Sequence, residues 1–265
     1  MGVQIMISFP LLWQTTKSNF KYLLIFTAIL CVFLIVMCNV FTPQTLNGIQ
    51  HSVEGSVISQ ILGDGTLISF MSNYFYAIMA IIFPMVYSIM VGNRLIAEKI
   101  DRGTMSSLLS TPTTRLQITL SSALYFILSL IFMWIVATGV GIVSAQTFQP
   151  DALDIDTFIS LNIGCFLYHF VISGICFCAS CIFNLSKTSL AFGAGIPLAF
   201  FVINLFIKLS EDLDWLKYFT LNTLFDTQKI IEDSGFENNF IIMVIAGMLL
   251  YLIGIIVFNK KDLPL

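Results

Sequence analysis

Six long apolar stretches alternate with shorter polar ones along this chain of 265 residues. A helix needs roughly 20 mostly apolar residues to cross a bilayer, and each stretch is about that length or longer. None of them contains Asp, Glu, Lys or Arg. We therefore predict six transmembrane helices, over approximately Tyr22–Phe41, Tyr74–Val91, Leu120–Ala145, Phe158–Phe183, Leu190–Ile207 and Phe240–Phe258.

Composition agrees with a membrane location for the whole chain. Hydrophobic residues make up 57% of the sequence and charged residues 10%, whereas soluble domains are about one quarter charged. Too few charges are present to cover a water-facing surface. The expected fold is a single all-α polytopic membrane domain spanning residues 1–265.

Basic residues between the apolar stretches predict the orientation, because cytoplasmic loops carry an excess of Lys and Arg. With the N-terminus inside, nine basic residues fall on the cytoplasmic side and three on the other. Both termini and the segment 92–119 are then cytoplasmic, and the protein lies in the plasma membrane. The inner set is Lys17, Lys21, Arg94, Lys99, Arg102, Arg115, Lys187, Lys260 and Lys261; the outer set is Lys208, Lys217 and Lys229.

Two flanking segments are neither apolar enough to span nor polar enough for a free loop. Residues 1–21 mix large apolar side chains with Trp13 and Lys17, which predicts an amphipathic helix on the inner leaflet. Residues 209–239 predict an extracellular re-entrant or interfacial pair of short helices. An ordinary outer loop with interfacial aromatic residues is the alternative for that segment. Residues 42–73 form a long outer loop in this scheme.

Signatures of catalysis, metal binding and ion coupling are absent from the sequence. No H-E-x-x-H, G-x-S-x-G or paired intramembrane carboxylate occurs. His169 suits packing better than a proton relay, and the cysteines near Cys178 suit small apolar positions better than a metal site. Spans without ionisable carboxylates or amines argue against an ion-coupled carrier. No basic run suits nucleic acid, and no phosphate-binding G-x-x-x-x-G-K-[ST] is present.

The densest polar cluster, EKIDRGTMSSLLSTPTTR, covers Glu98 to Arg115. The second span is expected to continue as a helix to Gly103, which would end it in the left-handed conformation. Thr104 or Ser106 would cap a short helix over Met105–Ser110, and Pro112 would stop it. The pattern predicts a short cytoplasmic helix lying across the end of the bundle, with an apolar face at Leu108 and Leu109.

This cluster resembles the cytoplasmic signature of type-2 ABC exporter permeases, which follows the second of six spans in that family. The stretch Tyr218–Lys229 is similar to the family's outer segment, and the tail Phe258–Leu265 resembles its usual ending. The resemblance covers the whole chain in topology. It is specific to particular residues mainly at Glu98–Arg115 and at the C-terminus.

The resemblance implies two permease halves, identical or homologous, working with two cytoplasmic ABC ATPase subunits that bind ATP and Mg²⁺. This chain would carry no cofactor or metal and would not be an enzyme. Hydrophobic or amphipathic peptides, such as toxins or antimicrobials, are the first expected cargo, and lipophilic drugs the second. The chain would also contact membrane lipid. A stand-alone six-span carrier or scaffold without an ATPase partner is the alternative. The residues expected at the ATPase contact are Glu98, Lys99, Arg102, Gly103, Thr104, Met105, Leu108, Leu109, Pro112 and Arg115.

Overall fold

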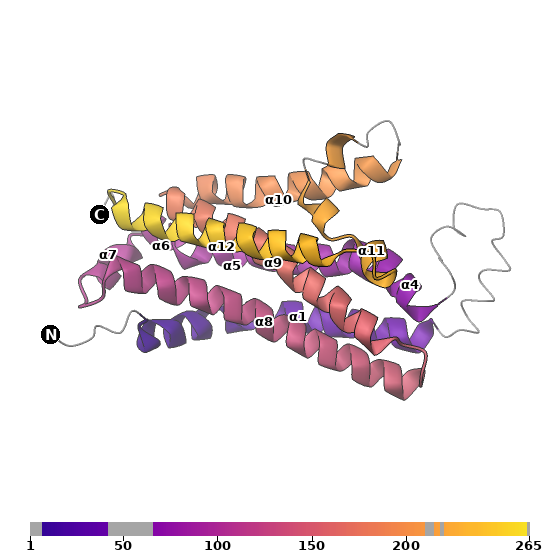
Figure 1. Ribbon diagram of the computed structural model, residues 1–265. Helices are drawn as coiled ribbons and strands as arrows, with labels where there is room; N and C mark the ends of the chain where they lie inside the picture. The colour runs from indigo at the N-terminus through magenta and orange to yellow at the C-terminus, as the bar shows by residue number, and fades with distance from the viewer. Residues whose placement is uncertain (1–6, 42–65, 210–214, 218–219, 264–265) are drawn as a thin grey trace.

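The computed structural model describes residues 7–41, 66–209, 215–217 and 220–263, and every regular element among these residues is a helix (Figure 1). Long helices run roughly parallel to one another along the bundle, and short helices lie at its two ends. The long elements are α1 (Phe9–Val40), the run of α4 (Leu67–Met71), η1 (Ser72–Met79), α5 (Ala80–Leu95) and α6 (Ala97–Asp101), then α8 (Arg115–Phe148), α9 (Ile155–Ile182), α10 (Ser186–Leu209) and α12 (Glu237–Lys260). The short elements are α7 (Thr104–Leu109), η3 (Leu221–Leu224) and α11 (Thr227–Ile231).

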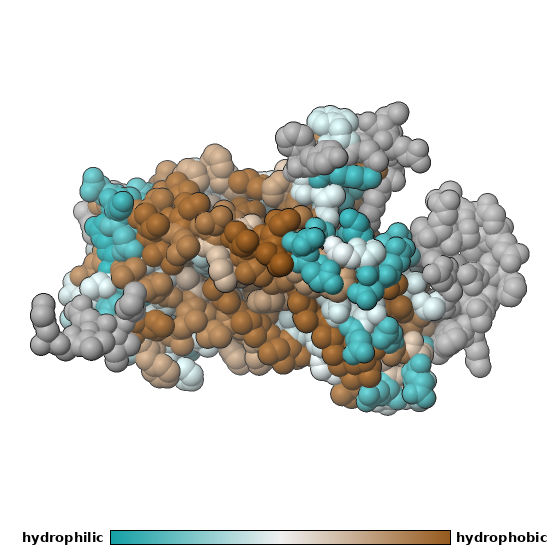
Figure 2. Space-filling view, viewed as in Figure 1, coloured by the Kyte–Doolittle hydropathy of each residue, from teal (hydrophilic) through white to brown (hydrophobic). Residues whose placement is uncertain are grey.

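Six helical stretches are long and apolar enough to cross a membrane, which confirms the predicted number of spans. Figure 2 shows an apolar band around the middle of the visible face, with hydrophilic residues concentrated toward both ends. The start of α1 and the end of α12 lie at the same end of the bundle as α6 and α7, whereas α4 and α11 lie at the other. Such a band between two polar ends is what a bilayer requires of a spanning protein.

Helix α9 forms the centre of the bundle. It packs against α5, α8, α10 and α12, and 83% of its most apolar window is buried. The corresponding share is only 11% in α10. Helix α9 is therefore apolar on all sides because other helices of the chain cover it. Most side chains of α10, in contrast, have no such cover within this chain and are exposed at the surface of the bundle.

The N-terminal segment differs from the prediction in one respect. The helix expected within residues 1–21 does not end before the first span, because α1 runs without a break from Phe9 to Val40. Polar side chains in this region bond to carbonyls one turn back, as Thr16 does to Leu12 and Asn19 to Thr15. Those bonds satisfy them inside a helix and remove any need for a turn. Residues 1–6 lie outside the described part.

At the end opposite α7, the segment before α12 forms two short helical turns, η3 and α11. Phe225 and Ile230 are buried, and Tyr168 donates a hydrogen bond to Asn222 over 2.9 Å. The prediction of short helices within 209–239 is confirmed for the described residues, although 210–214 and 218–219 lie outside them. The second helical run also begins earlier than expected, at Leu67; the remainder of the expected outer loop, 42–65, lies outside the described part.

His169 is buried in α9 and has backbone partners on both sides of its ring. Nδ1 lies 2.7 Å from the carbonyl oxygen of Cys165 and Nε2 lies 3.1 Å from that of Ile81. The rings of Trp134 and Tyr168 pack beside it. These contacts fit the packing role expected for His169 from the sequence. The bond to Ile81 joins α9 to α5 about one turn before Pro84.

Candidate functional site

The second span does not continue smoothly toward Gly103 as predicted, because the helix breaks at Ile96 between α5 and α6. Ile96 has φ −131° and ψ −62°, outside the helical region. The Ala97 N–H donates to the Ser180 hydroxyl of α9 over 2.9 Å. The same hydroxyl is 3.4 Å from the Asn93 carbonyl oxygen, to which it donates. A side chain from the central helix thus satisfies the backbone groups at the break.

Replacing Ser180 with alanine is expected to destabilise the protein by about 1–3 kcal/mol, because the buried Ala97 N–H would lose its acceptor. Ser189 supplies a matched control, since its buried hydroxyl has no hydrogen-bond partner within the described structure. Ser189→Ala should leave stability unchanged or raise it. The check is the thermal unfolding midpoint of the purified variants in detergent, and equal midpoints would contradict the role assigned to Ser180.

The turn between α6 and α7 depends on Gly103. Its φ is +71°, a conformation that costs other residues energy but is open to glycine. The Gly103 N–H donates to the Ile100 carbonyl over 2.9 Å. The predicted role of this glycine as the end of one helix and the boundary of the next is confirmed.

The predicted caps of the short helix are wrong in detail. Neither Thr104 nor Ser106 accepts a bond from the first turn of α7. Instead, the Thr104 hydroxyl donates to the Lys99 carbonyl and the Ser106 hydroxyl donates to the Gly103 carbonyl. The Thr104 hydroxyl therefore bonds back to α6, whereas the Ser106 hydroxyl bonds to the carbonyl at the start of α7. The geometry of a cap here could not be read from residue type alone.

Helix α7 is anchored by one face and open on the other. Met105 is fully buried, and Leu108 and Leu109 are half-buried against the core. The side chains that reach solvent carry hydroxyls, at Thr104, Ser106, Ser107 and Ser110. The expected apolar face exists, but it holds α7 onto the bundle rather than pointing away from it.

After α7 the chain passes the exposed Pro112 and enters α8 through a capping box. The Thr114 hydroxyl accepts from the Gln117 N–H over 3.2 Å, and the Gln117 side chain accepts from the Thr114 N–H over 3.0 Å. These reciprocal bonds satisfy two donors at the start of α8. The capping box therefore fixes the beginning of the third span, and only residues 110–114 separate it from the end of α7.

Side-chain bonds from residues 93–115 reach each of the remaining long helices. Arg94 donates to Asn19 and Tyr22 of α1, in addition to the Ser180 bond with α9. The start of α10 receives a bond from Asn93 to Ser186, over 2.8 Å. The Arg115 guanidinium donates to the Lys261 carbonyl at the end of α12, over 2.7 Å.

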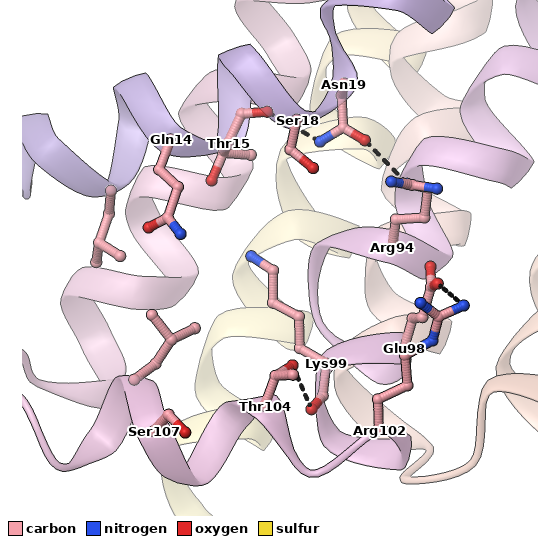
Figure 3. Close-up of a pocket in the computed structure, with 12 residues that line it drawn as sticks. Gln14, Thr15, Ser18, Asn19, Arg94, Glu98, Lys99, Arg102, Thr104 and Ser107 are labelled. Atoms are coloured by element: carbon pink, nitrogen blue, oxygen red, sulfur yellow. Dashed lines mark hydrogen bonds and ion pairs between the residues drawn. The ribbon is translucent and has the colours of Figure 1, made fainter.

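A pocket of about 430 Å³, lined by charged, polar and two leucine side chains, lies between the first turns of α1 and the α6–α7 turn (Figure 3). Glu98 and Arg102 form an ion pair, 2.7 Å between Oε1 and Nη2. Lys99 extends from α6 into the space between α1 and α7. Outside the pocket, at the end of α12, burial lowers the pKa of the Lys261 ammonium. The pocket is lined by Leu11, Gln14, Thr15, Ser18, Asn19, Arg94, Glu98, Lys99, Arg102, Thr104, Ser107 and Leu108.

The structure brings the ten residues predicted from the sequence to one end of the bundle, but the network also uses four that sequence reasoning missed. Asn19, Asn93, Ser180 and Ser186 hold the segment to its neighbours. Their signal in the sequence was their polar character within or beside apolar helices, because polar groups in lipid need hydrogen-bonding partners. No group of three potential ligands from His, Cys, Asp and Glu occurs within the described residues.

Together, the helical bundle and its apolar band define an integral membrane protein with six candidate spans. A family model described as ABC-2 family transporter protein matches residues 13–263. The chain therefore belongs to this family of non-catalytic membrane permeases, which generally work with ABC ATPase subunits. A comparison with curated proteins finds no match.

Proposed function

We propose that this chain is one permease half of an ATP-driven exporter, and that residues 94–115 receive movement from a cytoplasmic ATPase. The observation that carries the proposal is the network of bonds around this segment. It joins α7 directly to α8 and connects its flanks to α1, α9, α10 and the end of α12. A displacement of residues 94–115 as a unit would therefore act on these neighbouring helices, which is what a coupling element must do.

The exposed face of α7 suits a contact with a soluble partner. Four hydroxyl-bearing residues present hydrogen-bonding groups there, and Arg102 adds a charge at the rim. Because Met105 and the two leucines anchor the opposite face, a push on the hydroxyl face would be transmitted to the core instead of unfolding the helix. We assign Ser107 and Ser110 to this contact in addition to the residues expected from the sequence, which already include Thr104.

A second permease half, identical or homologous, would cover surface that this chain leaves exposed. The low burial of α10 supports that role, since its apolar side chains have few neighbours within the chain. Both halves would place α7 on the cytoplasmic side, with both termini inside and the segment before α12 outside. A re-entrant position for η3 and α11 is consistent with the burial of Phe225 and Ile230.

For cargo, hydrophobic or amphipathic peptides are our first proposal and lipophilic drugs our second. The six apolar stretches predicted from the sequence contain no Asp, Glu, Lys or Arg, so their central parts offer no such side chain to pair with a strongly charged substrate. Contact with lipid also favours spans with few charges, so the cargo must be identified by experiment. Peptides that stimulate ATP hydrolysis by the reconstituted complex would support it, and stimulation by lipophilic drugs alone would favour the second cargo.

The coupling proposal is tested by crosslinking to the partner ATPase. A Ser107→Cys variant, on the exposed face of α7, should crosslink to cysteines placed on the ATPase surface in the assembled complex. Thr147→Cys provides the control, because Thr147 is also exposed but belongs to the far end of α8. Crosslinking of the Thr147 variant instead would reverse the proposed orientation.

Failure of both variants to crosslink, together with failure of the unmodified chain to co-purify with the ATPase, would favour the stand-alone carrier or scaffold. That outcome would remove the coupling role from α7. Transport that continued without any ATPase would lead to the same conclusion.

A further inference from the structure

Among the residues that the structure describes, the pocket in Figure 3 is lined by three basic side chains and one carboxylate. Of its four charged side chains, Glu98 is paired with Arg102. Arg94 is held by the neutral side chains of Asn19 and Tyr22, and its guanidinium lies 4.8 Å from the centre of the Tyr22 ring. Lys99 Nζ has no hydrogen-bond or ion-pair partner among the described residues. Two cations therefore face the pocket without a carboxylate.

This arrangement is built to hold an anion. A partly buried ammonium loses favourable contact with water, and that loss is offset when a negative group binds beside it. Hydroxyl and amide groups of Gln14, Ser18 and Ser107 line the same space and can donate to phosphate oxygens. The volume of about 430 Å³ greatly exceeds the roughly 30 Å³ share of one water molecule, so it admits a phosphodiester with its polar substituent.

The position of the pocket favours a membrane lipid as the source of the anion. The first turns of α1 present polar residues such as Thr15 and Asn19 to the pocket, while Phe9 and Trp13 point away from the protein and are 73% and 65% exposed. Large exposed aromatic side chains of this kind belong at the headgroup layer. With these side chains in the headgroup layer, the pocket between α1 and the α6–α7 turn would lie near the level of the lipid phosphates.

We propose that this pocket binds the headgroup of an anionic phospholipid from the inner leaflet, through Arg94 and Lys99, and that the bound lipid bridges α1 and the α6–α7 turn. Basic pockets between helices on the cytoplasmic side are known to suit anionic headgroups. Because Thr104, Ser107 and Leu108 form part of the wall, an occupied pocket would brace α7 against α1. The choice of the inner leaflet rests on the proposed function, which places this end of the bundle on the cytoplasmic side.

The test is native mass spectrometry of the full chain in a neutral detergent, titrated with short-chain phosphatidylglycerol or phosphatidylcholine. Phosphatidylglycerol should bind more tightly. Lys99→Met should weaken its first binding event by about fivefold, since one basic residue near a membrane surface contributes that much affinity. Ser107→Glu, which adds a negative charge to the pocket wall, should weaken it at least as strongly.

Lys17→Met is the matched control, because Lys17 lies on α1 near the pocket but does not line it. Its affinity for phosphatidylglycerol should stay within about twofold of the unmodified chain. Unfolding midpoints without added lipid separate a lost site from a misfolded variant, and removal of a half-buried charge at Lys99 should not lower the midpoint.

Three results would overturn the proposal. Equal weakening by Lys17→Met and Lys99→Met would show general attraction to basic residues. Displacement of phosphatidylglycerol by an equal concentration of inorganic phosphate would identify a free-anion site instead of a lipid site. Loss of lipid binding whenever the partner ATPase is bound would assign the pocket to the protein contact.

Discussion

Gly103→Pro is expected to reduce the stimulation of ATP hydrolysis by this permease by about tenfold or more. Proline fixes φ near −65°, whereas the turn between α6 and α7 requires a φ of +71° at this position. Proline also lacks the N–H that donates to Ile100. Backbone strain of about 1–3 kcal/mol, together with the lost hydrogen bond, would remove α7 from its place against the core, and each 1.36 kcal/mol corresponds to about tenfold.

Gly103→Asn separates this conformational requirement from any contact that the glycine makes. Asparagine enters the left-handed region more readily than other residues, and no atom lies within 4 Å of the position that its Cβ would take. Stimulation by the asparagine variant should remain within a few-fold of the unmodified permease. The measurement is ATP hydrolysis by the reconstituted complex, normalised to bound ATPase. Full stimulation by the proline variant would show that α7 is not the coupling element.

The second large effect is expected at the crossing of α5 and α9. A Cβ at Gly92 would lie 2.7 Å from the Cys176 Cβ and 3.3 Å from the Phe126 ring, so the two helices approach closely only because this side chain is absent. Gly92→Leu should destabilise the fold by at least the 1–3 kcal/mol typical of overpacking. Since Cys176 Cβ is the nearest obstacle and belongs to the central helix, the bundle has little freedom to yield.

Gly139→Leu makes the same change at an exposed position of α8, where no atom lies within 4 Å of the added Cβ. It should leave the unfolding midpoint and the elution profile in detergent nearly unchanged, whereas Gly92→Leu lowers the midpoint and broadens the profile. Equal behaviour of the two variants would contradict the close packing assigned to Gly92.

The number of spans, the polar cluster between the second and third, and its glycine boundary were predictable from the sequence. Each depends on strong local physics: the length of apolar runs in a bilayer, and the preference of Gly103 for a positive φ. The caps of α7 and the break at Ile96 were not. The caps of α7 depend on which carbonyls the Thr104 and Ser106 hydroxyls can reach. The break at Ile96 depends on Ser180, which is 83 residues away along the chain from its partner Ala97.

Sequence alone determined that this chain belongs in a membrane, because its apolar stretches are too long and too poor in charge for water. It also marked Glu98–Arg115 as the place where the chain leaves that environment. Only the tertiary structure decided which residues act there. Leu108 and Leu109 pack against the core, so the exposed face of α7 carries the hydroxyl side chains. Arg94 and Lys99 line the same pocket. In spans that are apolar on nearly every face, periodicity cannot select the packed side; that choice depends on close approaches such as Gly92 against Cys176.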